Sequence, residues 1–189
     1  IVMQKEDLAT FNKIKKIKNI KIIKQKKRGY GNALIEGIKA VKTKYCCIIN
    51  ADGSMNPKYL KRMLKLCKEK DLIFTSRYQK PGGGSEDDDI VTSVGNFLFT
   101  LFGNVFFKLN ISDILFTYIL GKTKSFKKMK LSRHDFRICV ELPIKAKRLK
   151  LEYACIPSFE RARIGGKKKV NPIKDGFLIL TEMIRLFFK

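Results

Sequence analysis

Between residues 20 and 78 the sequence alternates short apolar segments with longer amphipathic ones, and this alternation strongly constrains the fold. Apolar segments rich in β-branched and aromatic residues occupy 20–25, 45–50 and 71–78. The segments between them, at 30–42 and 57–70, carry apolar residues at helical spacing. Strands that alternate with helices are typical of an α/β fold with a mostly parallel sheet. The uninterrupted apolar run at 45–49 predicts a strand covered on both faces.

The flanking parts of the chain carry weaker patterns. Residues 1–18 predict a Lys-rich helix, so that the chain would begin inside a helix, as expected of a fragment. Residues 136–150 predict a helix that Pro143 breaks or kinks. Residues 151–163 predict a strand, and 174–188 predict an amphipathic helix. We expect one domain over 1–170 and a C-terminal helix at 171–189, either packed on it or lying at a membrane interface.

Residues 90–107 contain no charged side chain and reach the lower length limit for a membrane span. Ser93, Asn96, Thr100, Asn104 and Lys108 recur at roughly helical spacing and leave a wide apolar face. The pattern favours an amphipathic helix that packs on the domain or lies in the bilayer interface. A membrane span and a plain core helix are the alternatives.

The composition is strongly basic, with 41 Lys and Arg against 17 Asp and Glu and a formal net charge of +24. This excess implies anionic partners: nucleic acid, a membrane surface or phosphorylated small molecules. Drift in an AT-rich genome would account for part of it. The five cysteines form neither a disulfide framework nor a zinc motif, which fits a reducing cytosolic compartment. His134 has no accompanying nucleophile motif and is expected at the surface.

A single carboxylate, Asp52, follows the strand predicted at 45–50. In parallel α/β sheets ligands bind at the carboxyl ends of strands, and Mg²⁺ and Mn²⁺ prefer oxygen ligands. Asn50 and Ser54, two residues to either side, also carry oxygen and share one side of an extended segment. These three residues are the candidate metal ligands. The alternative is that Asp52 and Gly53 only form a turn.

Gly29 and Gly31, just before a predicted helix, are typical of a loop that approaches a phosphate at a helix N-terminus. The motifs "RGYGNAL", "INADGSMNPKYL", "DLIFTSRY" and "RIGGKKKVNPIKDG" follow one another in the chain. In this order they resemble the family 2 glycosyltransferases of GT-A fold, and most closely the dolichol- or polyprenyl-phosphate mannosyl- and glucosyltransferases. The resemblance covers about residues 20–185. It implies a Rossmann-like, mostly parallel sheet flanked by helices. The family's opening motifs are absent, which implies either an N-terminally truncated domain or a degenerate protein.

The resemblance assigns the donor site. Asp52 would hold a Mg²⁺ or Mn²⁺ ion on the donor diphosphate, and Asn50 stands where the family usually has Asp. Arg77, Arg163 and Lys169 would bind phosphate.

The resemblance also bears on the acceptor site. Asp113 matches an acid near the acceptor, where it would act as a positioning group, a general base or a structural residue. Lys168 replaces the usual Ser of the late basic motif. The acids at 86–89 stand where the family often has Arg.

These assignments predict inverting transfer of a sugar from a GDP- or UDP-sugar to a polyprenyl phosphate at the cytoplasmic face of a membrane. A lipid phosphate is already ionised near neutral pH and needs no strong base. One alternative is a GT-A enzyme that acts on a glycan or protein. Another is a non-enzymatic module that binds nucleic acid, although most Phe residues lie in apolar helices rather than between basic residues.

Overall fold

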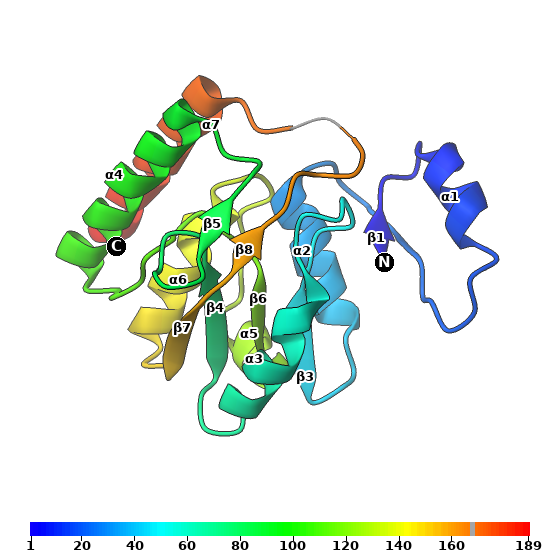
Figure 1. The fold of residues 1–189 in the computed structure, drawn as a ribbon, viewed down its shortest axis with the longest axis horizontal. Coiled ribbons are helices and arrows are strands. Elements are labelled where there is room, and N and C mark those ends of the chain that lie inside the picture. The colour runs from blue at the N-terminus through cyan, green and yellow to red at the C-terminus, as the bar shows by residue number, and fades with distance from the viewer. Residues whose placement is uncertain (167–168) are drawn as a thin grey trace.

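The computed structural model describes residues 1–166 and 169–189 and contains a central four-stranded sheet (Figure 1). The strand order is β3 (Tyr45–Ile48), β6 (Ile119–Lys122), β4 (Leu72–Ser76) and β7 (Tyr153–Pro157). Strands β4 and β7 are parallel, and β6 runs antiparallel to both of its neighbours, β3 and β4. Three of the four strands therefore point the same way, and the predicted mostly parallel α/β fold is confirmed.

Strand β6 is the one strand of the central sheet that the sequence did not predict. It has only four residues, and the apolar residues before it show no clear period. It lies between β3 and β4, where Ile119 is opposite both Ile48 and Phe74. Gly121 allows the close packing here, because a Cβ at this position would lie 2.4 Å from Leu72 Cδ2. Long-range pairing rather than local propensity thus makes this segment a strand.

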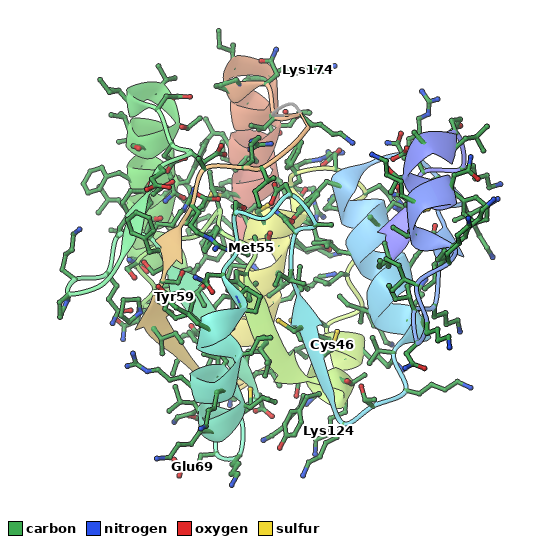
Figure 2. All side chains as sticks on the ribbon, turned by 45° about the vertical axis from the view of Figure 1, so that its right-hand side comes forward. Cys46, Met55, Tyr59, Glu69, Lys124 and Lys174 are labelled. Atoms are coloured by element: carbon green, nitrogen blue, oxygen red, sulfur yellow. The ribbon has the colours of Figure 1, made fainter. Side chains whose placement is uncertain are left out.

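Helices cover both faces of the sheet, as the apolar run at 45–49 predicted. Leu72 and Phe74 of β4 face a core closed by α2 (Tyr30–Ala40), α5 (Thr123–Lys128) and α6 (Ile138–Arg148). Ile73, one residue out of phase, packs on the other face with Met63 of α3 (Leu60–Leu66). The short helix η1 (Pro57–Tyr59) leads into α3. Figure 2 shows Cys46 in β3 and Met55 and Tyr59 in the segment that follows this strand.

Helix α6 continues through Pro143, so the predicted break is wrong. Pro143 is buried, as are Leu142 and Ile144 on either side of it. Leu142 packs in the core under the sheet and Ile144 packs in a second core with α7 (Pro172–Phe187). Packing on two sides therefore holds the helix together despite the lost backbone hydrogen bond.

The predicted helix at 1–18 is also wrong. Strand β1 (Val2–Met3) pairs in parallel with β2 (Ile23–Lys24), and only α1 (Leu8–Ile14) is helical. Asp7 caps α1 by accepting a hydrogen bond from the Thr10 backbone N–H. Because the first residues pair as a strand, the chain does not begin inside a helix.

Helix α4 (Ile90–Phe107) begins with a capping box formed by Asp89 and Thr92, and it lies beside α7 (Figure 1). Both helices pack with α6 around a core that includes Leu109, Val140 and Met183. The C-terminal helix at 171–189 is thus packed on the rest of the chain. Among the described helices, only α4 is long and apolar enough to cross a membrane, and 17% of its residues are buried.

Residues 79–89 contain one further short strand. Strand β5 (Gly84–Ser85) pairs in parallel with β8 (Phe159–Glu160). This pairing ties the acidic segment 86–89 to the segment that follows β7.

Candidate active site

Asp52 lies in the turn that follows β3, at the carboxyl end of that strand. Its Oδ1 atom accepts hydrogen bonds from the Ser54 backbone N–H at 3.1 Å and from Ser54 Oγ at 2.9 Å. Gly53 between them has a φ of 84°, which glycine adopts readily. The Asx-type turn that the sequence offered as an alternative is therefore present. No described residue donates to Oδ2, so this oxygen stays available for a ligand.

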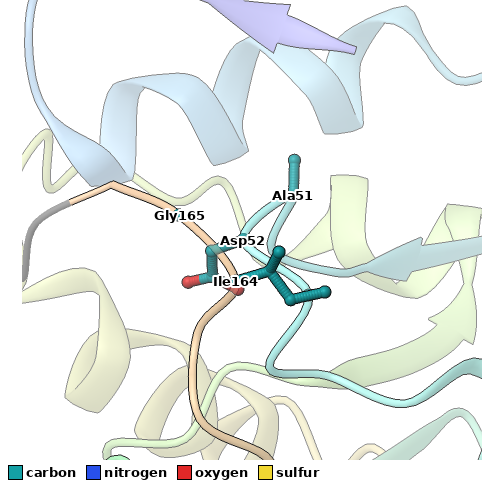
Figure 3. A pocket seen from close by; sticks show the side chains of 5 residues that line it. Ala51, Asp52, Ile164 and Gly165 are labelled. Carbon is teal, nitrogen blue, oxygen red and sulfur yellow. The ribbon is translucent and has the colours of Figure 1, made fainter.

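A segment more than 100 positions later in the chain lies along this turn. Met55 pairs with Glu160, the Arg161 backbone N–H donates to the Ser54 carbonyl at 3.0 Å, and the Ile164 backbone N–H donates to the Asp52 carbonyl at 2.8 Å. The two segments line a hollow of about 370 Å³ (Figure 3). Its walls are Ala51, Asp52, Gly53, Ile164 and Gly165. The structure thus joins Asp52 to the late basic motif that the sequence linked to it.

Arg163 flanks this hollow, and Asp87 holds its guanidinium. Arg163 Nε and Nη2 donate to the two carboxylate oxygens of Asp87 at 3.0 and 2.5 Å. The hydrogen bonds that Arg163 donates to Asp87 and, more weakly, the charges of Asp52 and Glu160 raise the pKa of Arg163. Arg161 donates from Nη2 to the Gly53 carbonyl at 3.1 Å. Two arginines therefore adjoin the Asp52 turn.

The acidic segment 86–89 docks on this basic segment. Besides the pair formed by Asp87, Glu86 accepts a hydrogen bond from the Ala162 backbone N–H at 3.0 Å. Asp88 pairs with Arg77 at 3.1 Å. The acids that depart from the family pattern are thus partners of its arginines.

The expectation that Arg77 faces a donor phosphate is not met. Its side chain is only 9% exposed, and its guanidinium pairs with Asp113 at 2.8 Å, Asp88 at 3.1 Å and Glu160 at 3.2 Å. Burial alone lowers the pKa of Arg77, but Asp113 and the other two carboxylates outweigh it and raise the pKa above its usual value. Because carboxylates surround the guanidinium, Arg77 acts as a buried structural cation.

Asp113 is similarly enclosed. Its Oδ2 accepts from the backbone N–H of Arg77 at 3.1 Å and from Nε at 2.8 Å. Its Oδ1 accepts from Arg77 Nη2 at 3.0 Å and from Asn96 Nδ2 at 2.9 Å. Four hydrogen bonds on a carboxylate that is 2% exposed favour the positioning or structural role over that of a general base.

Gly29 and Gly31 are each required by a close approach of protein backbone, and their expected role at a donor phosphate stays a prediction. A Cβ on Gly29 would lie 2.2 Å from the His134 carbonyl oxygen, and one on Gly31 would lie 2.2 Å from that of Arg133. The Asn32 backbone N–H also donates to the His134 carbonyl at 3.0 Å. Residues 133–135 therefore cover the N-terminus of α2. The His134 side chain is exposed, as predicted.

Two of the three expected metal ligands are engaged elsewhere. Asn50 Oδ1 accepts from Tyr30 Oη at 3.3 Å, and Ser54 is buried with its hydroxyl on Asp52. Tyr30 also bonds to Thr117 and stacks on Phe136 with ring centroids 5.1 Å apart. Burial raises the pKa of Tyr30. No local sequence signal marks Tyr30 as a partner of Asn50, because 20 positions separate them.

Lys169 is not among the residues that line the hollow, and its charge acts on Asp7, the residue that caps α1. Hydrogen bonds from Thr10 lower the pKa of Asp7, and the charge of Lys169 adds to this effect. Lys168, which replaces the family's Ser, lies outside the described residues.

Within the described ranges, no three His, Cys, Asp or Glu side chains gather in a group that could hold a metal. A metal at Asp52 would therefore have one protein carboxylate, an arrangement that suits Mg²⁺ or Mn²⁺ shared with substrate phosphates.

Residues 6–130 match the family model described as "Glycosyl transferase family 2". The chain belongs to this family. A solved structure described only as a mycobacterial protein superposes with a TM-score of 0.70 at 10% identity, over 98% of this chain and 62% of that one. Glucosyl-3-phosphoglycerate synthase from Mycobacterium tuberculosis, in complex with Mn²⁺, UDP and phosphoglyceric acid, superposes at 0.68 and 11% identity, over 98% and 65%. Another structure of that synthase, with UDP, gives 0.66 at 11% identity, over 98% and 66%.

These likenesses establish the GT-A type α/β fold. The family 2 chain spans about two thirds of the length of the solved structures that it matches. In this chain the sheet places one antiparallel strand, β6, between β3 and β4, and the Asp52 turn follows β3.

Proposed function

We propose that this chain carries the site for inverting transfer of a sugar from a nucleotide-sugar donor to a polyprenyl phosphate at a membrane surface. The observation that carries the proposal is the hollow at the end of β3, where Asp52 lies against the basic segment 161–164. A donor of this class leaves as a nucleoside diphosphate. Its departure places growing negative charge on phosphate oxygens, which nearby cations stabilise.

The chain's own groups suit a diphosphate at this hollow. Arg161 and Arg163 supply guanidinium groups, whose planar donors match phosphate oxygens. Asp52, through its available Oδ2, would hold Mg²⁺ or Mn²⁺, and such an ion neutralises charge on the leaving diphosphate. The solved synthase is described in complexes with Mn²⁺ and UDP, which supports this choice of cofactor and donor.

The acceptor proposal rests on the state of Asp113. Because both of its oxygens are occupied by Arg77 and Asn96, it is poorly placed to remove a proton from a hydroxyl acceptor. A phosphate acceptor needs no such base, since its second pKa is about 6. The solved synthase is described with phosphoglyceric acid, also a phosphate-bearing molecule, so a soluble phosphorylated acceptor is the competing candidate.

The outward face of α4 supports a lipid acceptor over a soluble one. Val94, Phe97 and Leu101 are 53%, 65% and 49% exposed, whereas Asn96 and Thr100 point inward and are buried. The inward groups bind backbone: Asn96 Oδ1 accepts from Leu115 N at 3.1 Å, and Thr100 Oγ1 accepts from Ile114 N at 3.1 Å. A helix that packs its polar face inward and presents its apolar face outward suits burial in a bilayer interface. We propose peripheral attachment to the cytoplasmic leaflet through this face.

The test is a transfer assay with the full-length protein. UDP- and GDP-sugars are offered with polyprenyl phosphate, 3-phosphoglycerate or a free glycan, in the presence of Mg²⁺ or Mn²⁺. Transfer to polyprenyl phosphate is expected.

Asp52→Asn keeps the acceptor oxygen for Ser54 but removes the charge, and it should lower turnover by about 10²-fold or more. Glu69→Gln, at an exposed position after α3 and outside the Asp52 hollow, is the matched control (Figure 2). Full transfer by the Asp52 variant rejects the metal role, and transfer only to 3-phosphoglycerate or glycan rejects the lipid acceptor.

A further inference from the structure

A second hollow, of about 610 Å³, lies between the segment 128–133, the second half of α6 and the end of α7. It shares no lining residue with the Asp52 hollow. Neither the sequence motifs nor the transfer reaction uses it. Its walls bring together three segments that lie far apart in the chain.

The charged side chains of the lining are all cationic. Seven of its residues are Lys or Arg, from all three segments, and none is Asp or Glu. Two carboxylates lie beneath it: Glu141 is fully buried and Glu182 is 2% exposed. Burial alone raises the pKa of both groups, but hydrogen bonds from Lys145 to Glu141 and from Arg185 to Glu182 outweigh it and lower both pKa values. Counted over the lining and the two acids beneath it, seven cations and two carboxylates leave a net charge of five positive.

The buried carboxylates hold three of these cations in place. Lys145 Nζ lies 2.7 Å from Glu141, while Arg133 and Arg185 lie 2.9 and 2.6 Å from Glu182. Arg133 uses Nε in this pair, which leaves its terminal nitrogens for a ligand. Cations that are fixed before binding lose little conformational entropy when they bind an anion.

Backbone groups close the hollow on two sides. Lys145 Nζ also donates to the Lys130 carbonyl at 2.8 Å, which ties α6 to the segment 128–133. Arg148 Nη2 donates to the Leu186 carbonyl, which ties α6 to the end of α7. The cationic walls are therefore joined to one another, and they do not depend on mobile surface lysines alone.

We propose that this hollow is a binding site for phosphate groups, carried either by an anionic lipid head group or by a small soluble phosphate. Aromatic side chains beside it favour the lipid source. Phe188 is 83% exposed and stacks edge-on with Phe187, which also packs on Phe106 of α4. The cation of Arg148 lies 5.9 Å from the Phe107 ring. A phosphate site beside exposed aromatic groups suits the boundary between head groups and acyl chains.

The test measures binding without any sugar donor, so its failure is separate from a failure of transfer. The full chain is sedimented with phosphatidylcholine vesicles that contain phosphatidylinositol 4-phosphate. Inorganic phosphate and inositol 1,4-bisphosphate are titrated calorimetrically as soluble probes. The site variant Lys128→Gln/Lys130→Gln/Lys189→Gln removes three charges and leaves the pairs with Glu141 and Glu182 intact. The matched control, K61Q/K65Q/K68Q, removes three exposed lysines from the region of α3.

Loss of anionic-vesicle binding by the site variant is expected to be on the order of 100-fold, since each lysine near an anionic surface contributes about fivefold. The control should change by only a fewfold. Binding of the soluble probes to the wild type but not to the site variant would identify free phosphate as a ligand; binding of vesicles alone would identify the head group. An equal loss in both triple variants, or no binding of any probe to the wild type, overturns the proposal.

Discussion

Arg77 is a cation held in the interior by three acids from different parts of the chain. Asp113 follows α4, Asp88 precedes it, and Glu160 belongs to β8. Taking a charge out of water is costly, so each member of such a cluster depends on the others for compensation. Ser85 Oγ donates to Glu160 at 2.7 Å, which extends the network to β5. Loss of one acid therefore leaves the buried positive charge of Arg77 with too little negative charge around it to offset the cost of its burial.

Asp113→Asn should lower the free energy of unfolding by about 3–5 kcal/mol, because it removes one charge from a buried ion pair and leaves its partner uncompensated. Urea denaturation followed by circular dichroism measures the change. Glu152→Gln is the control, since Glu152 pairs with Lys70 at the surface and its loss should cost less than about 1 kcal/mol. Equal destabilisation by the two variants would contradict the structural role assigned to Asp113.

At the scale of the element, α4 shows that spacing alone does not decide which face of a helix is buried. Its polar residues recur at helical intervals, as the sequence showed, but they turn toward the protein. Asn104 illustrates the reason: its side chain both donates to the Ile111 carbonyl at 2.8 Å and accepts from the Ile111 N–H at 3.1 Å. The segment 109–115 is irregular backbone, and these side chains satisfy hydrogen-bonding groups that would otherwise be buried without partners.

Phe97→Ser/Leu101→Ser should weaken binding of the protein to lipid vesicles at least tenfold, because each buried apolar side chain contributes about 1.5–3 kcal/mol. The free energy of unfolding should stay within about 0.5 kcal/mol of the wild type, since both side chains are exposed. Flotation with vesicles and urea denaturation give the two values.

A substitution on the inward face of α4 serves as the control, because it should change stability and leave vesicle binding unchanged. Thr100→Val removes the acceptor for the Ile114 N–H and should lower stability by about 1–3 kcal/mol, without weakening vesicle binding by the folded protein. If the outward pair of substitutions left vesicle binding intact, α4 would not be the attachment surface.

On the scale of the whole molecule, the proposed membrane attachment combines the net charge of +24 with the exposed apolar side chains of α4 and α7. Surface charges attract an anionic membrane over distances of about a Debye length, roughly 10 Å at 0.1 M salt. Apolar insertion acts only at contact. The two contributions are therefore separable by ionic strength.

Raising the salt concentration toward about 1 M, where the Debye length is roughly 3 Å, should greatly weaken binding to anionic vesicles. Binding to neutral phosphatidylcholine vesicles should change little over the same range, because it depends on the apolar face. Co-sedimentation at several salt concentrations makes the comparison. Salt-independent binding to anionic vesicles would show that the basic surface takes no part in attachment.

Several elements could be predicted because their signals are local. The apolar run at 45–49 and the amphipathic pattern of α2 each encode burial within a few residues, and both elements formed. The position of Asp52 after β3 followed in the same way. Strand β6 could not be predicted, because its four residues become a strand only between two partners from other parts of the chain.

The sequence by itself determined the α/β class, the carboxylate at the end of β3 and the amphipathic character of α4, because each depends on spacing along one short segment. Only the tertiary structure decided which groups meet. Arg77 was expected at a phosphate and pairs with Asp113, and Gly31 was expected at a ligand and packs on Arg133. These outcomes depend on contacts between segments distant in sequence, where burial of a charge or the approach of two backbones sets the free energy. No local pattern records such contacts.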